Sequence, residues 1–546
     1  MLVKLFPDNA RLRQLALAAA LLRKGRSIHE LANTSRIIHR GLGSADREVF
    51  ERLRELRTRL AELSMVGPDP GDLDYLKRVK ELTDQGDALE VELARRSAPL
   101  RALYALPPVR ELTGRVAAAL PKDAALIQFV TYPIVSAPRS NPHLSAPQKK
   151  GTGYLALLLF ADGSTRAVNL GSAEAIDLAA LRMQRAFAIQ SVSYEEVAQE
   201  LYTRAFQPLV PHLGKVKRLL VAPEGQLNLI PFAALHDGKG FLIDTWDFTY
   251  LTSGKDLLAR PQGGPPARSM VVIADPDFAA SPVAAAGEAQ ASPAPMELIP
   301  DLESAFSSLR AELADENWPP LPGTRREAEA IQRLFPRTQL LLGEAATKQA
   351  LLGLPTPGIL HIATHGFFRD DAGTTTKARA VKFCCALAKT PRLPSSADPL
   401  LRSGLVLVGA RADNDSDTPE NSWVTALELA GLNLWGTQLV VLSACDTGRG
   451  DIQPGQGVYG LRRAFLSAGA ETVVTSLWQV KDDTTSELME GYYQRLFSGR
   501  GRTAALREAM QALRQKHPHP HFWAPFIAIG RDTPLRGMLA RVPSSQ

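Results

Sequence analysis

A histidine and a cysteine each follow a short apolar segment that the sequence predicts to be a buried strand. The first segment, 359–363, leads to His365 and Gly366, and the second, 439–442, leads to Cys445. In an open parallel sheet, functional groups gather just beyond the carboxyl ends of the strands, so neighbouring strands would bring His365 and Cys445 together. A thiol nucleophile needs such a base within hydrogen-bond reach. The spacing therefore predicts a nucleophilic Cys445 with His365 as its base.

The residues around this pair support the hypothesis. Gly366 has no Cβ, so its backbone N–H can approach a developing oxyanion. His361 lies on the same strand and face as His365 but four residues earlier, inside the layer, which predicts a core histidine. Cys384 and Cys385 stand in a polar, basic insert with no histidine nearby in the sequence, and we interpret them as incidental.

Three other patterns imitate metal or cofactor sites. His361 and His365 have the spacing of a zinc-protease motif, but no glutamate stands between them and the segment is typical of a strand, not a helix. The stretch 455–460 matches a dinucleotide fingerprint, but a long loop separates it from the preceding strand, where a tight turn is required. The run 517–521 alternates histidine with proline and indicates an extended surface loop. We therefore expect no cofactor and no metal.

Alternating strands and helices are predicted from about residue 124 onward. Asp162-Gly163 indicates a hairpin turn, and Thr324 with Glu327 has the spacing of a capping box at a helix start. Buried strands separated by helices predict an α/β fold with a mostly parallel sheet covered on both faces. The expected strands are 125–130, 154–160, 165–168, 218–223, 270–274, 339–342, 359–363, 439–442 and 472–476.

The first hundred or so residues are expected to be helical. Leu53, Leu56, Leu60 and Leu63 recur at steps of three and four, and after a Pro/Gly-rich break at 67–72 a second apolar seam runs through Leu76, Val79, Leu82, Leu89 and Leu93. This pattern predicts an antiparallel helical hairpin, an element that usually packs or binds a partner. We divide the chain into a helical region (1–120), an α/β region (121–268) and a C-terminal α/β domain (269–546).

Composition excludes several classes of protein. The 546 residues are 45% hydrophobic and 22% charged with a net charge of +6, and Lys and Arg are interleaved with Asp and Glu, so neither disorder nor a nucleic-acid patch is expected. Three cysteines make no disulfide framework, which predicts a reducing, cytoplasmic setting. No apolar run reaches 18 residues, and the run 15–22 reads as a helix face and not as a signal peptide. We expect no membrane contact.

The sequence resembles the CHAT domain, a caspase- and separase-like cysteine protease domain usually found behind tetratricopeptide repeats. The resemblance covers roughly residues 190–535, with the N-terminal helices similar to the segment that joins the repeats to this domain. The motifs that carry it include 361–368 (HIATHGFF), 440–448 (VVLSACDTG), 455–470, 476–483 (SLWQVKDD) and 521–526 (HFWAPF), with 221–225, 229–232 and 321–324 upstream.

The resemblance implies a caspase-like sheet, a His365/Cys445 dyad and a degenerate, pseudo-protease-like character for 121–268. In separases, an Asp in the tryptophan-containing segment lies in the S1 pocket and selects Arg at P1. The similar position here is Asp482, with Asp483 close behind, and a carboxylate would pair a guanidinium well. An ordinary helix-capping role for this Asp is an equal alternative. Gln456 departs from the Glu of many relatives, and no repeat array is visible ahead of residue 1.

Two functions follow as expectations. The first is a cysteine endopeptidase that cuts protein substrates after a basic P1 residue, is held inactive until triggered, and acts in bacterial defence or regulated cell death, as the resemblance implies. The stretch 369–421 could cover its groove, and the N-terminal helices could bind a regulatory partner. The alternative is a CHAT-fold scaffold that binds without cutting.

Overall fold

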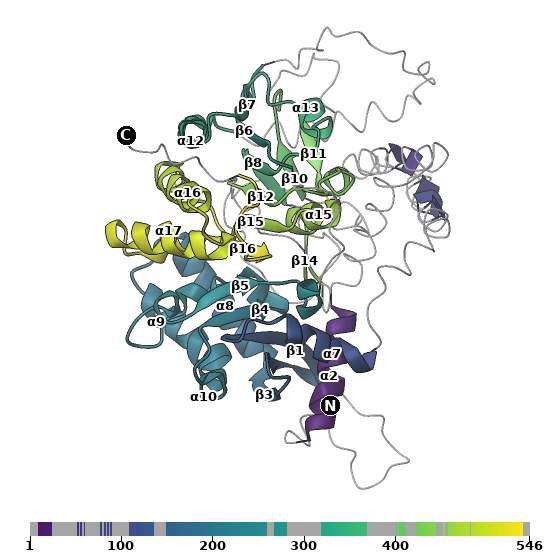
Figure 1. The fold of residues 1–546 in the computed structure, drawn as a ribbon, viewed down its shortest axis with the longest axis vertical. Coiled ribbons are helices and arrows are strands. Elements are labelled where there is room, and N and C mark those ends of the chain that lie inside the picture. The colour runs from purple at the N-terminus through teal and green to yellow at the C-terminus, as the bar shows by residue number, and fades with distance from the viewer. Residues whose placement is uncertain are drawn as a thin grey trace.

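The computed structural model describes residues 9–24, 109–135, 149–258, 267–280, 318–368, 403–410, 422–443, 457–480 and 482–538, together with residue 400, residues 451–453 and a few residues between 52 and 89. Eleven strands of the described chain form one sheet (Figure 1). In spatial order they are β3 (Thr165–Ser172), β2 (Lys149–Phe160), β1 (Ala124–Val135), β4 (Arg218–Ala222), β5 (Asp247–Tyr250), β16 (Phe526–Gly530), β15 (Thr472–Ser476), β12 (Leu439–Leu442), β8 (Ile359–Ala363), β6 (Met270–Pro276) and β7 (Thr338–Gly343).

Nine of these eleven strands form two parallel blocks that run in opposite directions, and the antiparallel hairpin of β2 and β3 extends the first block. β1, β4, β5 and β16 pair in parallel, as do β15, β12, β8, β6 and β7. The blocks meet where β15 pairs antiparallel with β16. The carboxyl ends of the two blocks therefore lie at opposite edges of one continuous sheet. We call the described residues 9–258 the N-terminal half and 267–538 the C-terminal half.

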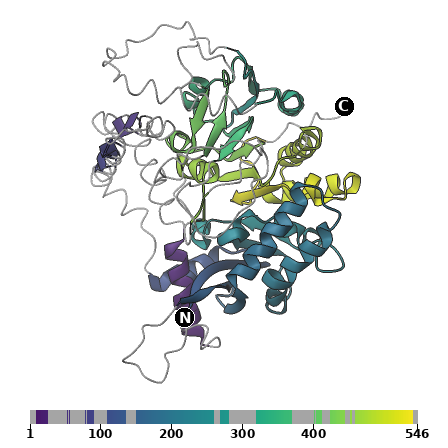
Figure 2. The ribbon, with the colours of Figure 1, turned by 180° about the vertical axis from the view of Figure 1, so that it is seen from behind.

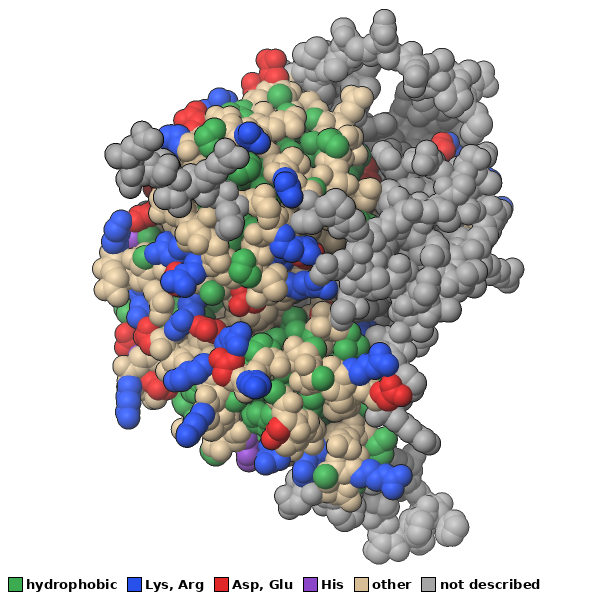
Figure 3. Space-filling model, viewed as in Figure 1, with side chains coloured by type: hydrophobic (Ala, Val, Ile, Leu, Met, Phe, Trp, Pro, Cys, Tyr) green, Lys and Arg blue, Asp and Glu red, His purple; other side chains and the backbone are tan. Residues whose placement is uncertain are grey.

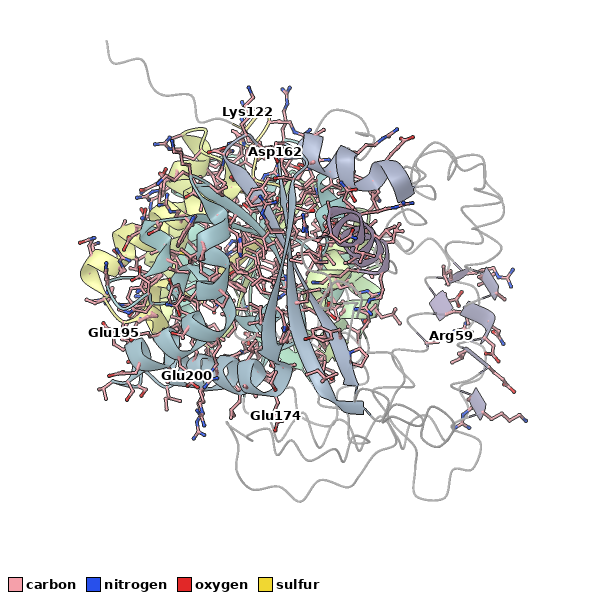
Figure 4. The ribbon with its side chains drawn as sticks, turned by 90° about the horizontal axis from the view of Figure 1, so that it is seen from below. Arg59, Lys122, Asp162, Glu174, Glu195 and Glu200 are labelled. Carbon is pink, nitrogen blue, oxygen red and sulfur yellow. The ribbon has the colours of Figure 1, made fainter. Side chains whose placement is uncertain are left out.

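The described strands confirm every strand segment that the sequence predicted. The predicted hairpin is confirmed as well: β2 and β3 pair antiparallel, Gly163 between them has φ 83°, and the backbone N–H of Ser164 donates to Oδ1 of Asp162 at 2.8 Å. Figure 4 shows Lys122 and Asp162 at one end of the N-terminal half and Glu174 at the other. The carboxyl edge of β1 is thus on the side of Glu174.

Helices cover both faces of the N-terminal half. Leu126 and Leu220 point to a cluster with leucines of α2 (Ala10–Arg23) and α7 (Val109–Ala119). Their neighbours Ile127 and Val221 point to the opposite face, where α8 (Ala173–Ala188) and α9 (Tyr194–Leu201) pack. This alternation is expected for strands buried on both faces. The short α10 (Val210–Leu213) leads into β4.

Helices also flank the sheet of the C-terminal half. Figures 1 and 2 show α12 (Pro322–Leu334), α16 (Asp482–Phe497) and α17 (Arg502–Lys516) on one side of β8, β12 and β15, with α13 (Lys348–Leu352) and α15 (Leu461–Ala468) on the other. The remaining elements are short: α14 (Ala426–Leu429), α18 (Pro520–Trp523), a sheet of β11 (Trp423–Thr425), β10 (Ser403–Val406) and β9 (Gly366–Phe368), and the pair β13 (Asp451–Gln453) with β14 (Gly457–Tyr459).

One helix begins differently from the prediction. α12 starts at Pro322, and Thr324 lies within its first turn, where its hydroxyl donates to the carbonyl oxygen of Leu321 at 2.7 Å. The predicted capping box at Thr324 and Glu327 is wrong, because Pro322 has a φ already suited to the first helical turn. The predicted N-terminal hairpin lies mostly outside the described residues.

The described surface carries mixed charge. On the face that Figure 3 shows, Lys and Arg side chains are interspersed with Asp and Glu. Among the described helices, none combines the length and hydrophobicity that a bilayer crossing requires.

Candidate functional site

The two expected catalytic residues follow neighbouring strands at matched positions. Ile362 of β8 and Leu442 of β12 are partners in a parallel pair, and the backbone N–H of Ser443 donates to the carbonyl oxygen of Ile362 at 2.9 Å. His365 stands three residues after Ile362, and Cys445 stands three residues after Leu442. Cys445 itself lies outside the described residues, and Ser443 is the last described residue before it.

His365 is a buried side chain two residues beyond the end of β8. Its exposed fraction is 7%, and its ring lies between those of Phe278 and Trp318, with centroids 5.2 and 5.4 Å away. Its Nε2 lies 2.8 Å from the carbonyl oxygen of Pro319. A carbonyl oxygen only accepts hydrogen bonds, so Nε2 carries the proton in this contact, and neutral His365 has a basic Nδ1. This orienting carbonyl could not be predicted, because the segment before α12 carries no motif.

Gly366 presents its backbone N–H away from the neighbouring strand. The N–H of Val406 donates to the carbonyl oxygen of His365 at 2.9 Å, and Gly366 lies opposite Leu405 in the antiparallel pair of β9 and β10. This pattern makes Gly366 and Leu405 a non-hydrogen-bonded pair. The N–H of Gly366 therefore points to the side of β9 that faces away from β10, as an oxyanion donor would need.

A small cleft of about 20 Å³, room for about one water molecule and partly open to solvent, lies at the carboxyl ends of β8, β12 and β15. Its walls include Thr364, which precedes His365, and Ser443, two residues before Cys445. Trp478, Val480 and Phe526 form an apolar side. The cleft is thus positioned to receive a group next to the expected dyad.

Glu327 is the carboxylate in the wall of this cleft. It is 2% exposed, and its Oε2 accepts a hydrogen bond from Oγ of Ser443 at 3.1 Å. Its Oε1 lies 3.0 Å from Nε2 of His361, whose Nδ1 lies 3.0 Å from the hydroxyl of Tyr493. The contact between Glu327 and His361 is within ion-pair distance but is not well aligned for a hydrogen bond. His361 is fully buried, so the expectation of a core histidine is confirmed.

Of the two expected specificity residues, only Asp483 has a side chain that the structure describes. Asp483 is at the surface, with 77% of its side chain exposed, and it pairs with Arg326 of α12 at 2.5 Å. Asp482 is the first residue of α16, and its side chain lies outside what the structure describes. Glu327, by contrast, was interpreted as a capping residue and was missed as a candidate. A helix that began at Thr324 would use Glu327 as a capping residue. Because α12 begins at Pro322, Glu327 lies on the buried face of the helix instead.

The described part of the chain contains no arrangement of side chains suited to binding a metal ion. No group of three or more His, Cys, Asp or Glu side chains there could hold an ion. His361 and His365 have the spacing of zinc ligands. His361 instead contacts Glu327 and Tyr493, and His365 contacts the carbonyl oxygen of Pro319.

The N-terminal half has a different arrangement at its own carboxyl edge. Nζ of Lys24, just after α2, donates to the carbonyl oxygens of Phe129 at 3.2 Å, Ala222 at 2.7 Å and Pro223. Lys24 is 2% exposed and lies 3.9 Å from the carboxylate of Glu224. Burial lowers the pKa of Lys24 to about 8, and Glu224 partly opposes this shift. A buried cation therefore closes the edge of β1 and β4.

Comparisons with known proteins assign the family. The model of the CHAT domain matches residues 195–531, more than half of the chain, and the chain therefore belongs to the CHAT-domain family. The resemblance stated from the motifs is confirmed.

Curated relatives are much longer than this chain. Tetratricopeptide repeat protein 28 of Homo sapiens is 29% identical over 326 residues, and that of Mus musculus is 27% identical over 332 residues. Each match covers 59% of this chain but only 12% of the relative.

Solved structures show weaker likenesses. The Saccharomyces cerevisiae separase–securin complex gives a TM-score of 0.30 at 10% identity, covering 88% of this chain and 27% of that one. The Arg-specific cysteine proteinase gingipain R gives a TM-score of 0.29 at 9% identity, covering 66% and 74%. The strand order and pairing of the described residues define the α/β fold.

Proposed function

We propose that this protein is a cysteine endopeptidase that cuts protein substrates after a basic residue, with Cys445 as nucleophile and His365 as base. The observation that carries the proposal is the matched register: His365 and Cys445 follow paired residues of adjacent parallel strands by equal numbers of residues. Membership in the CHAT-domain family supports the same class of chemistry.

The arrangement of His365 suits a proton shuttle. Because Nε2 donates to the carbonyl oxygen of Pro319, Nδ1 is the nitrogen that would accept the Cys445 proton. The resulting thiolate would attack the peptide carbonyl, and the backbone N–H of Gly366 would stabilise the oxyanion. The imidazolium would protonate the leaving amine as the C–N bond breaks and a thioester forms. Water, deprotonated by His365, would then hydrolyse the thioester and release the acid product.

The test compares wild type with single substitutions on fluorogenic peptides bearing Arg or Lys at P1 and on candidate partner proteins. Cys445→Ala and His365→Ala should each lower kcat/KM by about 10³-fold or more. Cys384→Ala is the matched control, since that cysteine is interpreted as incidental, and it should keep wild-type rates. Equal silence of wild type and Cys445→Ala with both peptides and proteins would contradict the proposal.

A non-cleaving CHAT-fold scaffold is the second candidate. Its support is that the curated relatives are named for tetratricopeptide repeats and not for a peptidase. Binding of a partner that stays intact in wild type and is unaffected by Cys445→Ala would favour this alternative. An inactive resting state and a role in bacterial defence or cell death stay predictions.

A further inference from the structure

Exposed apolar side chains gather on one helix of the N-terminal half. Among the described residues, four of the five exposed large hydrophobic side chains follow one another along α8 and the turn after it, with 40% to 91% of their surface exposed: Leu178, Leu181, Ile189 and Val192. The fifth, Leu15, stands alone on α2. Single exposed apolar residues are ordinary, whereas a group of them on one element marks a contact surface.

The two leucines lie on the face of α8 that points away from the sheet. The buried face of the helix carries Ile176, Met183 and Phe187. At 3.6 residues per turn, Leu178 and Leu181 stand on the opposite side of the helix. A helix that packs on a sheet with one face normally keeps its outer face polar. The outer face of α8 is instead apolar at its centre.

Charged residues of opposite sign flank the two leucines on this outer face. Glu174 stands four residues before Leu178, and Arg185 stands four residues after Leu181, and both charged side chains are exposed. The steps of four, three and four place all four residues within an arc of about 60° around the helix axis. The face is therefore acidic at its start, apolar in the middle and basic at its end.

We propose that this face of α8 binds a second copy of the chain, with the two helices antiparallel about a two-fold axis between residues 179 and 180. This axis places Leu178 against the partner's Leu181 and Glu174 against the partner's Arg185, and symmetry repeats both contacts. A parallel pair would place like charges together at both ends. The face is thus complementary to itself in one orientation, which is the property that a two-fold contact requires.

The surroundings of the face leave room for such a contact. Arg182 lies at its flank and pairs with Glu200 of α9 at 3.5 Å, so this charge has a partner within the chain. Figure 4 shows Glu174 at the outer margin of the N-terminal half. The helix has 16 residues and is therefore about 24 Å long. A contact made by one helix of this length is small, so we expect a dissociation constant on the order of 10 µM.

Sedimentation velocity on the intact chain tests this surface. Wild type should pass from monomer to dimer as its concentration rises through about 10 µM. Leu181→Glu should weaken the association about tenfold or more, because it places a carboxylate against the partner's Leu178. Leu15→Glu changes the exposed leucine of α2 and is the matched control, which should associate like wild type. A wild type that stays monomeric at about 100 µM, or a Leu181→Glu that dimerises like wild type, would overturn the inference.

A charge exchange tests the antiparallel orientation. Glu174→Lys and Arg185→Glu should each weaken the dimer about tenfold or more, because each creates two contacts between like charges. When these two variants are mixed, they should form a heterodimer, since both of its contacts then join opposite charges. The double variant Glu174→Lys/Arg185→Glu should regain the dimer of wild type. Failure of the mixed variants to associate, or single variants that dimerise like wild type, would contradict the two-fold pairing.

Two controls separate this contact from folding and from catalysis. Glu196→Lys reverses an exposed charge on α9 and should leave the association unchanged. The melting temperatures of all variants should stay near that of wild type, because each substituted side chain is exposed. Cys445→Ala should dimerise like wild type, since the contact uses no residue of the expected dyad. A loss of association in Glu196→Lys equal to that in Glu174→Lys would show a nonspecific charge effect and overturn the inference.

Discussion

The two carboxyl edges of the sheet bury opposite charges. In the N-terminal half, the Lys24 ammonium fills the edge of β1 and β4 and contacts three carbonyl oxygens and Glu224. In the C-terminal half, the corresponding edge of β8 and β12 keeps a cleft, and the buried group beside it is the Glu327 carboxylate. The first edge therefore buries an ammonium against carbonyl groups, whereas at the second edge, among the described residues, the carboxylate contacts a histidine and a serine.

This difference shows how one architecture gives both a closed and an open edge. Both blocks use parallel strands whose carboxyl ends would form a crevice. The helix α2, which comes from a different part of the chain, supplies the group that closes the first crevice. The fold alone therefore does not make a site, and the residues at each edge decide whether a ligand can enter.

The largest effect is expected when the closed edge is opened. Lys24→Met removes the cation while leaving Glu224 and three carbonyl groups buried, so the free energy of unfolding at pH 7.5 should fall by about 3 kcal/mol. Urea denaturation followed by circular dichroism measures this change. Arg11→Met, at an exposed position of α2, should cost far less. A loss in Lys24→Met no larger than in Arg11→Met would remove the distinction between the two edges.

Stability should also depend on pH through Lys24. Its pKa is about 8 in the folded protein and 10.5 for the free side chain, so the unfolded chain binds this proton more tightly. The folded state therefore gains relative stability as pH rises through 8 towards 10.5. The difference in unfolding free energy between wild type and Lys24→Met should widen by about 2 kcal/mol from pH 7.5 to 9.5. A constant difference over this range would contradict the assignment.

The smallest effects are expected when the hydroxyl groups that contact the two carboxylates are removed. Thr131 donates to Glu224 at 2.8 Å, and Ser443 donates to Glu327 at 3.1 Å. Thr131→Ala and Ser443→Ala should each lower the unfolding free energy by about 1 kcal/mol. Urea denaturation that finds no loss in either variant would contradict the two hydrogen bonds.

Much of the fold was accessible from sequence, because short apolar runs rich in Val, Ile and Leu mark strands buried on both faces. The core role of His361 followed from its position within such a run. The reversal of direction between the two blocks was not accessible. It depends on β16 pairing antiparallel with β15, which lies 50 to 58 positions earlier in the chain, and in parallel with β5, which lies almost 280 positions earlier.

The buried charges were also not accessible. Lys24 stands in a basic cluster typical of a solvated surface, and only the packing of α2 on the sheet buries it. Glu327 has the spacing of a capping residue, and the helix start at Pro322 decides that it faces His361 instead. A local sequence pattern depends on a residue's neighbours along the chain, whereas these roles depend on residues that are distant in the sequence but adjacent in the fold.

The continuous sheet limits how the chain can be cut for study. Dividing it near residue 269, where the sequence suggests a domain boundary, would separate β5 from β16 and leave each as an edge strand with one unpaired side. It would also uncover the apolar residues between them, including Phe248, Tyr250 and Ile527. Exposed, apolar edges of this kind promote self-association. Fragments of either half should therefore aggregate during purification, and the intact chain is the unit to express and assay.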